Sequence, residues 1–223
     1  MEQLLQKIKV DINENLYLKD PFSSDLGKEI IAKSIKCIRE YGLENFNFKK
    51  LATEVGSTEA AIYRYFENKH KLMLFLNLWY WGFLELNLVM GTTNLVDPQE
   101  KLQVAIKILV NGPLSKKNDF VDPVTLHDMI VEEAIKAFMT KEVDEDRRKG
   151  FFTTYLNMGE RIAEILKEIN PAYNYPKTLV SMIMEASLLQ RFHAKHFPTL
   201  IEAQASEEER LAFFNELITK AIN

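Results

Sequence analysis

One stretch, from Phe46 to Lys69, most strongly constrains what this chain can fold into. It reads FNFKKLATEVGSTEAAIYRYFENK. Asn47 and Thr58 are N-cap candidates, because their side-chain oxygens can accept hydrogen bonds from free backbone N–H groups. Apolar residues follow each cap at helical spacing, and Gly56 between them permits a tight turn. The stretch therefore predicts two short helices joined by a turn, the layout in which a second helix enters a DNA major groove.

This stretch resembles the DNA-binding segment of TetR-family transcriptional regulators. The residues that carry the resemblance are Asn47, Leu51-Ala52, Gly56, Thr58, Ile62-Tyr63-Arg64-Tyr65-Phe66, Asn68-Lys69 and Leu72. The likeness covers about residues 25–75, and the rest of the chain resembles the family only in length and helical character. It implies a three-helix DNA-binding head followed by a larger helical body that binds a ligand and dimerises.

Composition independently favours an all-α fold. The chain has 223 residues, of which 47% are hydrophobic, so it can bury a large core, while Gly and Pro are sparse. The overall net charge is −4, but residues 25–75 hold nine Lys and Arg against seven Asp and Glu. A weakly positive head on an acidic body is the asymmetry expected of a DNA-binding protein.

We expect about nine helices and three regions: an N-terminal extension (1–24), a helix-turn-helix domain (25–70), and a ligand-binding and dimerisation domain (71–223). The expected helices span 25–41, 48–55, 58–66, 68–90, 98–111, 123–140, 151–169, 177–197 and 206–222. The charged stretch at 141–150, KEVDEDRRKG, reads as a loop or a solvated helix end. In the extension, Leu5, Ile8, Ile12 and Leu16 share a helical face, which favours packing on the body over contact with DNA.

The sequence indicates a cytoplasmic protein without a membrane anchor. Cys37 is the single cysteine, and we expect a small buried hydrophobe there. The one membrane-like run, from Leu72 to Met90, contains Glu85 and two asparagines, and a charge in mid-span is costly in lipid. It therefore predicts a buried helix.

The expected recognition helix, residues 58–66, supplies most of the candidate DNA contacts. Thr58 can bind a phosphate at the helix start, and the next three residues would face base edges in an exposed first turn. The resemblance implies a phosphate contact at Asn47 as well. The candidate DNA-binding residues are Asn47, Thr58, Glu59, Ala60, Ala61, Tyr63, Arg64 and Lys69. Glu59 departs from the family pattern, because an acid there repels phosphate unless it accepts from a cytosine amino group.

Aromatic residues and methionines in the body can line an adaptable apolar pocket, although most such residues are simply core. The candidate pocket residues are Trp79, Phe83, His127, Met129, Phe152, Tyr155, Met158 and Met182. No catalytic constellation or phosphate-binding glycine loop stands out, so we expect no enzyme, cofactor or metal centre. His193 and His196 lack further ligands at suitable spacing and favour a surface pair.

The last two expected helices carry apolar residues beyond one stripe, and the resemblance implies that they pair across a two-fold axis. The candidate dimer residues are Leu179, Met182, Ile183, Ala186, Phe213, Phe214 and Leu217. These features predict a homodimeric, ligand-responsive regulator that acts as a repressor. A small apolar or amphipathic ligand would release it from a double-stranded operator. The alternative is a lipid or small-molecule binding protein of the same fold with weak or lost DNA binding.

Overall fold

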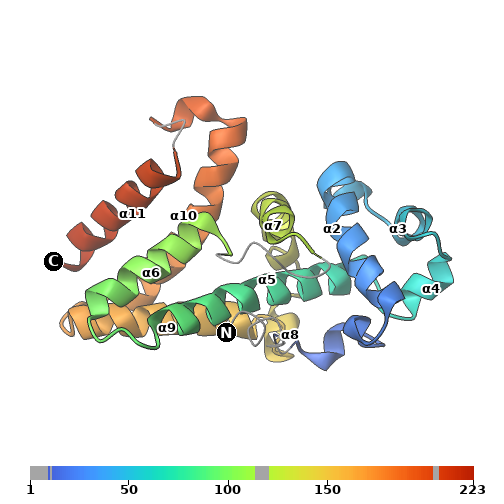
Figure 1. Ribbon diagram of the computed structural model, residues 1–223, viewed down its shortest axis with the longest axis horizontal. Helices are drawn as coiled ribbons and strands as arrows, with labels where there is room; N and C mark the ends of the chain where they lie inside the picture. Colours follow the sequence, from blue (N-terminus) through green and yellow to red (C-terminus); the bar gives the residue numbers. More distant parts are fainter. Residues whose placement is uncertain (1–9, 11, 114–120, 203–205) are drawn as a thin grey trace. The chain divides into compact units, whose positions relative to one another are not determined.

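The computed structural model describes residues 10, 12–113, 121–202 and 206–223, and the predicted all-α fold is confirmed (Figure 1). The described residues form ten α-helices and three short 3-10 helices, with no strand among them. The α-helices are α2 (Asp25–Asn45), α3 (Phe48–Val55), α4 (Glu59–Tyr63), α5 (Lys69–Thr92), α6 (Pro98–Asn111), α7 (Pro123–Phe138), α8 (Val143–Arg148), α9 (Thr153–Ile169), α10 (Pro176–His196) and α11 (Glu207–Ile222).

Contacts divide the chain into two compact units. Unit 1 comprises Met1–Gly82 with Ser115–Thr153, and unit 2 comprises Phe83–Leu114 with Thr154–Asn223. Helix α5 begins in unit 1 and continues into unit 2. The division into a DNA-binding head and a ligand-binding body is a functional one, and it stays a prediction.

In unit 1, α2 packs against both α3 and α7, and α3 packs against α4. Aromatic rings fill the space beside α5: the ring centroids of Phe66 and Phe75 are 5.3 Å apart, and Phe22 contacts Phe75 and Trp79 at 5.7 and 5.6 Å. Cys37 is buried on α2, as predicted, and burial raises the pKa of its thiol. This core holds the short helices of the head on one framework.

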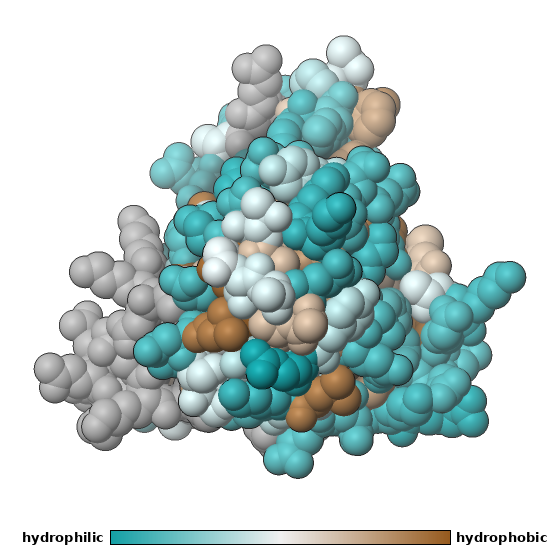
Figure 2. Space-filling model, turned by 90° about the vertical axis from the view of Figure 1, so that its right-hand side faces the viewer, coloured by the Kyte–Doolittle hydropathy of each residue, from teal (hydrophilic) through white to brown (hydrophobic). Residues whose placement is uncertain are grey.

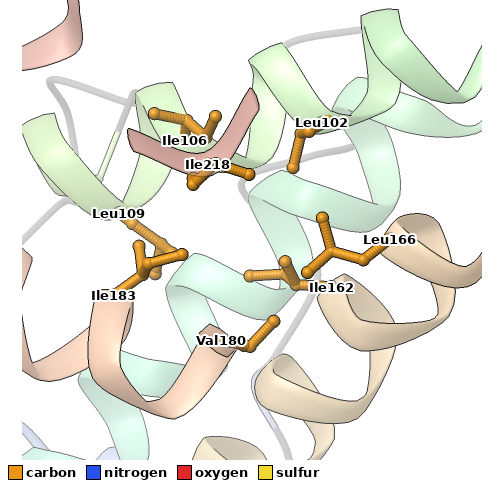
Figure 3. Close-up of a pocket in the computed structure, with 8 residues that line it drawn as sticks. All are labelled: Leu102, Ile106, Leu109, Ile162, Leu166, Val180, Ile183 and Ile218. Atoms are coloured by element: carbon orange, nitrogen blue, oxygen red, sulfur yellow. The ribbon is translucent and has the colours of Figure 1, made fainter. Parts of the chain in front are cut away.

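In unit 2, α6 packs against α10 and α11. Aliphatic side chains from α6, α9, α10 and α11 surround a small apolar hollow (Figure 3), which has room for little more than one water molecule. Its lining residues are Leu102, Ile106, Leu109, Ile162, Leu166, Val180, Ile183 and Ile218. Close packing therefore dominates this unit.

Helix α5 is long and apolar enough to be considered as a membrane span, but 72% of its most apolar window is buried within the protein. Charged and amide groups interrupt it, and Glu85 pairs with Arg161 at 2.8 Å. The predicted buried helix therefore fits the structure.

Two segments differ from, or extend, the sequence-based expectation. The charged stretch at 141–150 contains a true helix, α8, and buries Asp146 against His70. In the N-terminal extension, Ile12 and Leu16 are buried, which supports packing, while Leu5 and Ile8 lie outside the described residues.

A close backbone approach on α2 yields the first prediction. A Cβ atom at Gly27 would lie 2.2 Å from the carbonyl oxygen of Pro21 and 2.7 Å from its Cα. Because these are backbone atoms that cannot rotate away, Gly27→Ala should lower the free energy of unfolding by about 2–3 kcal/mol in chemical denaturation. Gly159→Ala, whose Cβ would meet only Met184 Sδ at 3.5 Å, is the control and should be neutral or stabilising. Equal effects of the two variants would contradict this packing.

Candidate nucleic-acid interface

The predicted caps form the two short helices of the head. The Lys50 backbone N–H donates to Asn47 Oδ1 at 2.9 Å, and the Ala61 N–H donates to Thr58 Oγ1 at 3.2 Å. Gly56 ends α3 with φ of 68°, in the left-handed region that favours glycine. Cap and turn chemistry thus define a helix-turn-helix within residues 47–63.

Helix α4 presents a polar face outward. Thr58, Glu59, Ala60, Tyr63 and Arg64 are all exposed. The opposite side is buried, with Ile62, Tyr65 and Phe66 in the core, as expected from their spacing. Figure 2 shows the α3–α4 side of the molecule, where the visible surface is mainly hydrophilic with only small separate apolar patches. Such a face is suited to contact with solvent or with a polar partner.

Ala61 is a correction to the predicted contacts. We expected it in the exposed first turn facing base edges, but only 4% of it is exposed. Its position next to Ile62 places it on the inward side of a helix that is barely more than one turn long. Ala61 therefore cannot reach a thymine methyl group without unfolding of the helix.

Tyr63 is held in place by a neighbouring ring. Its side chain is 47% exposed, and its ring meets the Phe48 ring edge-on with centroids 5.0 Å apart. The ring is therefore oriented by α3, while the hydroxyl remains available to a phosphate or base. Arg64 follows it at the C-cap of α4 and is also exposed.

Lys69, the predicted phosphate ligand, forms hydrogen bonds with backbone carbonyls of the head. Its Nζ donates to the backbone carbonyl oxygens of Leu43 and Glu44, both at 3.0 Å, and lies 3.4 Å from that of Phe46. These carbonyls lie at the end of α2. The side chain is engaged within the head, and sequence analysis missed this role because the partners lie more than twenty residues earlier in the chain.

Behind α4, a hydrogen-bond cluster joins Tyr65 to the start of α2 and to the N-terminal extension. The Tyr65 and Ser24 hydroxyls lie 2.8 Å apart, and Lys19 Nζ donates to the Tyr65 hydroxyl at 3.4 Å. The hydrogen bond with Ser24 lowers the pKa of Tyr65. The cluster anchors the residues that directly follow the recognition helix.

The eight predicted pocket residues are divided equally between the two units. Trp79, His127, Met129 and Phe152 belong to unit 1, whereas Phe83, Tyr155, Met158 and Met182 belong to unit 2. None of the eight residues lines the apolar hollow. The side chain of Met182 is 64% exposed, so the prediction that it lines a pocket is wrong.

Two of the predicted pocket residues, His127 and Tyr155, make polar contacts in the structure. The Tyr80 hydroxyl lies 2.7 Å from His127 Nδ1 in the core, and the Tyr155 hydroxyl donates to Glu185 Oε1 at 2.9 Å. Burial raises the pKa of Tyr155. Sequence reasoning missed the aliphatic hollow because it searched for aromatics and methionines; the apolar stripes of α6 and α9 were the available signal.

The predicted dimer residues fall into two groups. Leu179, Ile183 and Phe214 are buried within unit 2 and cannot form an interface in this arrangement. The remaining predicted residues, Met182, Ala186, Phe213 and Leu217, are exposed or half-buried.

The comparisons with known proteins agree with this geometry. The family model described as "Bacterial regulatory proteins, tetR family" matches residues 30–75. Residues 30–75 form a TetR-family domain. The predicted resemblance is therefore confirmed for this segment. No curated protein sequence matches the chain significantly.

Solved structures extend the likeness to the TetR-type fold as a whole. AibR in complex with isovaleryl coenzyme A and operator DNA is 13% identical, with a TM-score of 0.62 over 85% of this chain and 97% of AibR. The fatty acid degradation regulator FadR from Bacillus halodurans is 14% identical, with a TM-score of 0.63 over 90% and 96%. FadR from Bacillus subtilis in complex with stearoyl-CoA is 16% identical, with a TM-score of 0.55 over 87% and 97%. At these identities the likeness shows the fold.

The cap of α4 can be tested directly. Thr58→Ala removes the acceptor for the Ala61 N–H, so the free energy of unfolding should fall by about 1 kcal/mol in chemical denaturation. Thr58→Ser keeps a hydroxyl and should retain most of the stability. If Thr58→Ala unfolds at the same denaturant concentration as the wild type, the cap does not stabilise this helix.

Proposed function

We propose that this protein is a ligand-responsive, DNA-binding transcriptional regulator that acts as a homodimer in the cytoplasm. The single observation that carries the proposal is the exposed polar face of α4, capped by Thr58 and held on a buried TetR-type framework. In such a head, the exposed side chains of α4 enter the major groove while neighbouring groups contact phosphates. A repressor is the form of regulation we favour.

Four exposed side chains carry the expected contacts of α4. Thr58 places a hydroxyl and free N–H groups at the helix start, which suits a phosphate. Tyr63 and Arg64 lie at the other end of the helix, where hydroxyl and guanidinium donors suit phosphate or guanine. Glu59, also exposed, would accept from a cytosine amino group, and this makes the operator sequence selective at that position.

The ligand is proposed to be a small apolar or amphipathic molecule that enters unit 2. The hollow there is lined entirely by aliphatic side chains (Figure 3) and is too small to hold such a molecule without movement of the surrounding helices. Binding that favours the opened arrangement would shift the protein away from its DNA-bound state, typically by about 1–3 kcal/mol of coupling. Because AibR and Bacillus subtilis FadR were solved with acyl-CoA molecules, acyl-CoAs are the first ligands to try.

A binding protein of this fold without DNA affinity is the second candidate. Two observations favour it: Glu59 puts a negative charge on the face that would meet phosphates, and the Lys69 ammonium is held by backbone carbonyls. Glu59 lowers the net positive charge that drives association with DNA, and the carbonyl contacts of Lys69 compete with a phosphate for its donors.

DNA binding is tested by gel shift with duplexes from upstream of the protein's own coding sequence. The wild type should bind, and Tyr63→Ala should weaken binding roughly ten-fold or more, because it removes both a hydroxyl contact and the oriented ring. Tyr63→Phe keeps the packing on Phe48 and isolates the hydroxyl. Tyr175→Phe, at a tyrosine that is 65% exposed outside the head, is the matched control and should not change affinity.

The outcomes separate the two candidate functions. Release of the wild type by isovaleryl-CoA or stearoyl-CoA would support a ligand-responsive regulator. Equal, weak binding by the wild type and Tyr63→Ala at low salt would rule out the DNA-binding role, and recovery of a copurified lipid would then favour the second candidate.

Exposed apolar residues on α10 and on α11, here called the apolar stripe, support the proposed dimer. Met182, Ala186 and Leu189 recur at intervals of four and three residues along one side of α10, and Phe213 and Leu217 lie four apart on α11. All but the half-buried Ala186 are exposed, and Phe213 shows 53% of its surface. Large apolar side chains grouped in this way are typical of a surface that a second protein covers.

A charge placed in this stripe should break the dimer. Met182→Glu is expected to convert a dimer into a monomer in sedimentation velocity at micromolar concentration, because the interface would then bury an unpaired carboxylate. Val96→Glu, at a valine that is 92% exposed outside the stripe, is the matched control and should leave the mass unchanged. A wild type that sediments as a monomer would contradict the proposed interface.

A further inference from the structure

The last turn of α2 ends in backbone carbonyls that need donors from elsewhere. Gly42 adopts φ of 73° and ψ of 154°, which interrupts the helical ladder three residues before the helix ends at Asn45. Phe46 and Asn47 are then extended, so the chain leaves the helix axis at once. The final carbonyls of a helix have no intrahelical partner, and together they carry the negative end of the helix dipole.

Two lysines from later elements supply those donors. Lys69, the first residue of α5, donates to the carbonyls of Leu43 and Glu44 at 3.0 Å each. Lys50, on α3, donates to the carbonyl of Asn45 at 2.9 Å, and its Nζ lies 4.7 Å from the centre of the Tyr41 ring. The end of α2 is thus capped from both helices that flank the recognition helix along the chain.

The donor count of Lys69 leaves little for DNA. An ammonium has three N–H donors, and Lys69 Nζ has three carbonyl acceptors within hydrogen-bond distance, the third being that of Phe46 at 3.4 Å. A phosphate contact would require it to give up carbonyls in the last turn of α2 and directly after it. Its location therefore favours an internal partner.

The contact between Lys69 and the end of α2 joins two segments of the head that lie more than twenty residues apart in the chain. Lys69 follows the recognition helix by six residues, while its partners precede α3, so one side chain joins the exit of the helix-turn-helix to its entrance. The Asn68 side chain fixes the same turn of α5, because its Oδ1 accepts from the Lys71 N–H at 2.9 Å. Helices α3 and α4 lie in the sequence between the two ends that this contact joins.

We propose that Lys69 is a positioning residue, whose ammonium clamps the end of α2 to the start of α5 and so orients α4, and that it is not a phosphate ligand. The proposal rests on the proposed DNA-binding function for its effect on affinity. The clamp itself is a property of the free protein and can be measured without DNA.

The salt dependence of DNA binding distinguishes a clamp from a phosphate ligand. A residue that neutralises a phosphate contributes about 0.9 to the slope of log affinity against log salt concentration. Lys69→Met should weaken binding roughly three- to ten-fold and leave this slope unchanged, because the loss comes from misorientation of α4. Arg64→Met, at an exposed position on the recognition helix, is the comparison and should flatten the slope by about one unit per head.

Hydrogen exchange of the free protein gives the second readout. In Lys69→Met, the amides of residues 43–48 should exchange faster than in the wild type, while those of α10 should be unchanged. Lys69→Arg retains a cationic donor and should restore slow exchange. A flattened slope with unchanged exchange at residues 43–48 would overturn the proposal and make Lys69 a phosphate ligand. If the wild type does not bind DNA, the proposed function fails, and the exchange result alone decides whether the clamp exists.

Discussion

The head depends on the burial of two helices that are too short to be stable alone. Helices α3 and α4 have eight and five residues, and isolated helices below about 12–15 residues are marginal in water. Their stability must come from packing, and Leu51, Ile62 and Phe66 are accordingly fully buried. Because the inner side of α4 is committed to the core, its outer side is free to be polar. A fixed inner face is what gives the exposed side chains a defined direction.

The first turn of α5 connects that head to the rest of unit 1. Lys69 holds the end of α2, the next residue, His70, lies 2.8 Å from the buried carboxylate of Asp146 on α8, and Lys71 Nζ lies 3.9 Å from the centre of the Phe151 ring. Three consecutive side chains thus contact three separate parts of unit 1. Since α5 continues into unit 2, a rearrangement there has a covalent, helical route to the head.

Local chemistry was readable from the sequence, and distant contacts were not. The caps at Asn47 and Thr58 and the turn at Gly56 depend on neighbouring residues, so their patterns predicted the structure correctly. Helix α8 was not predicted, because its charged residues indicated a solvent-exposed segment. In the structure Asp146 is buried and forms a hydrogen bond with His70, which lies 76 residues earlier in the chain. Ala61 was misplaced because a five-residue helix is too short for periodicity to define its faces. The apolar hollow was missed because aromatic residues and methionines were taken as the signal of a pocket, whereas aliphatic side chains from four helices line it.

Selection of binding sequences from a random duplex library tests the central claim, that this head reads DNA, most directly. We expect enrichment of a pseudo-palindromic sequence whose two half-sites are separated by about one helical turn or a multiple of it, as two copies of α4 related by a two-fold axis require. Loss of that enrichment in Tyr63→Ala would assign the reading to α4. A wild-type protein that enriches no sequence, and binds all duplexes equally weakly at low salt, would contradict the account.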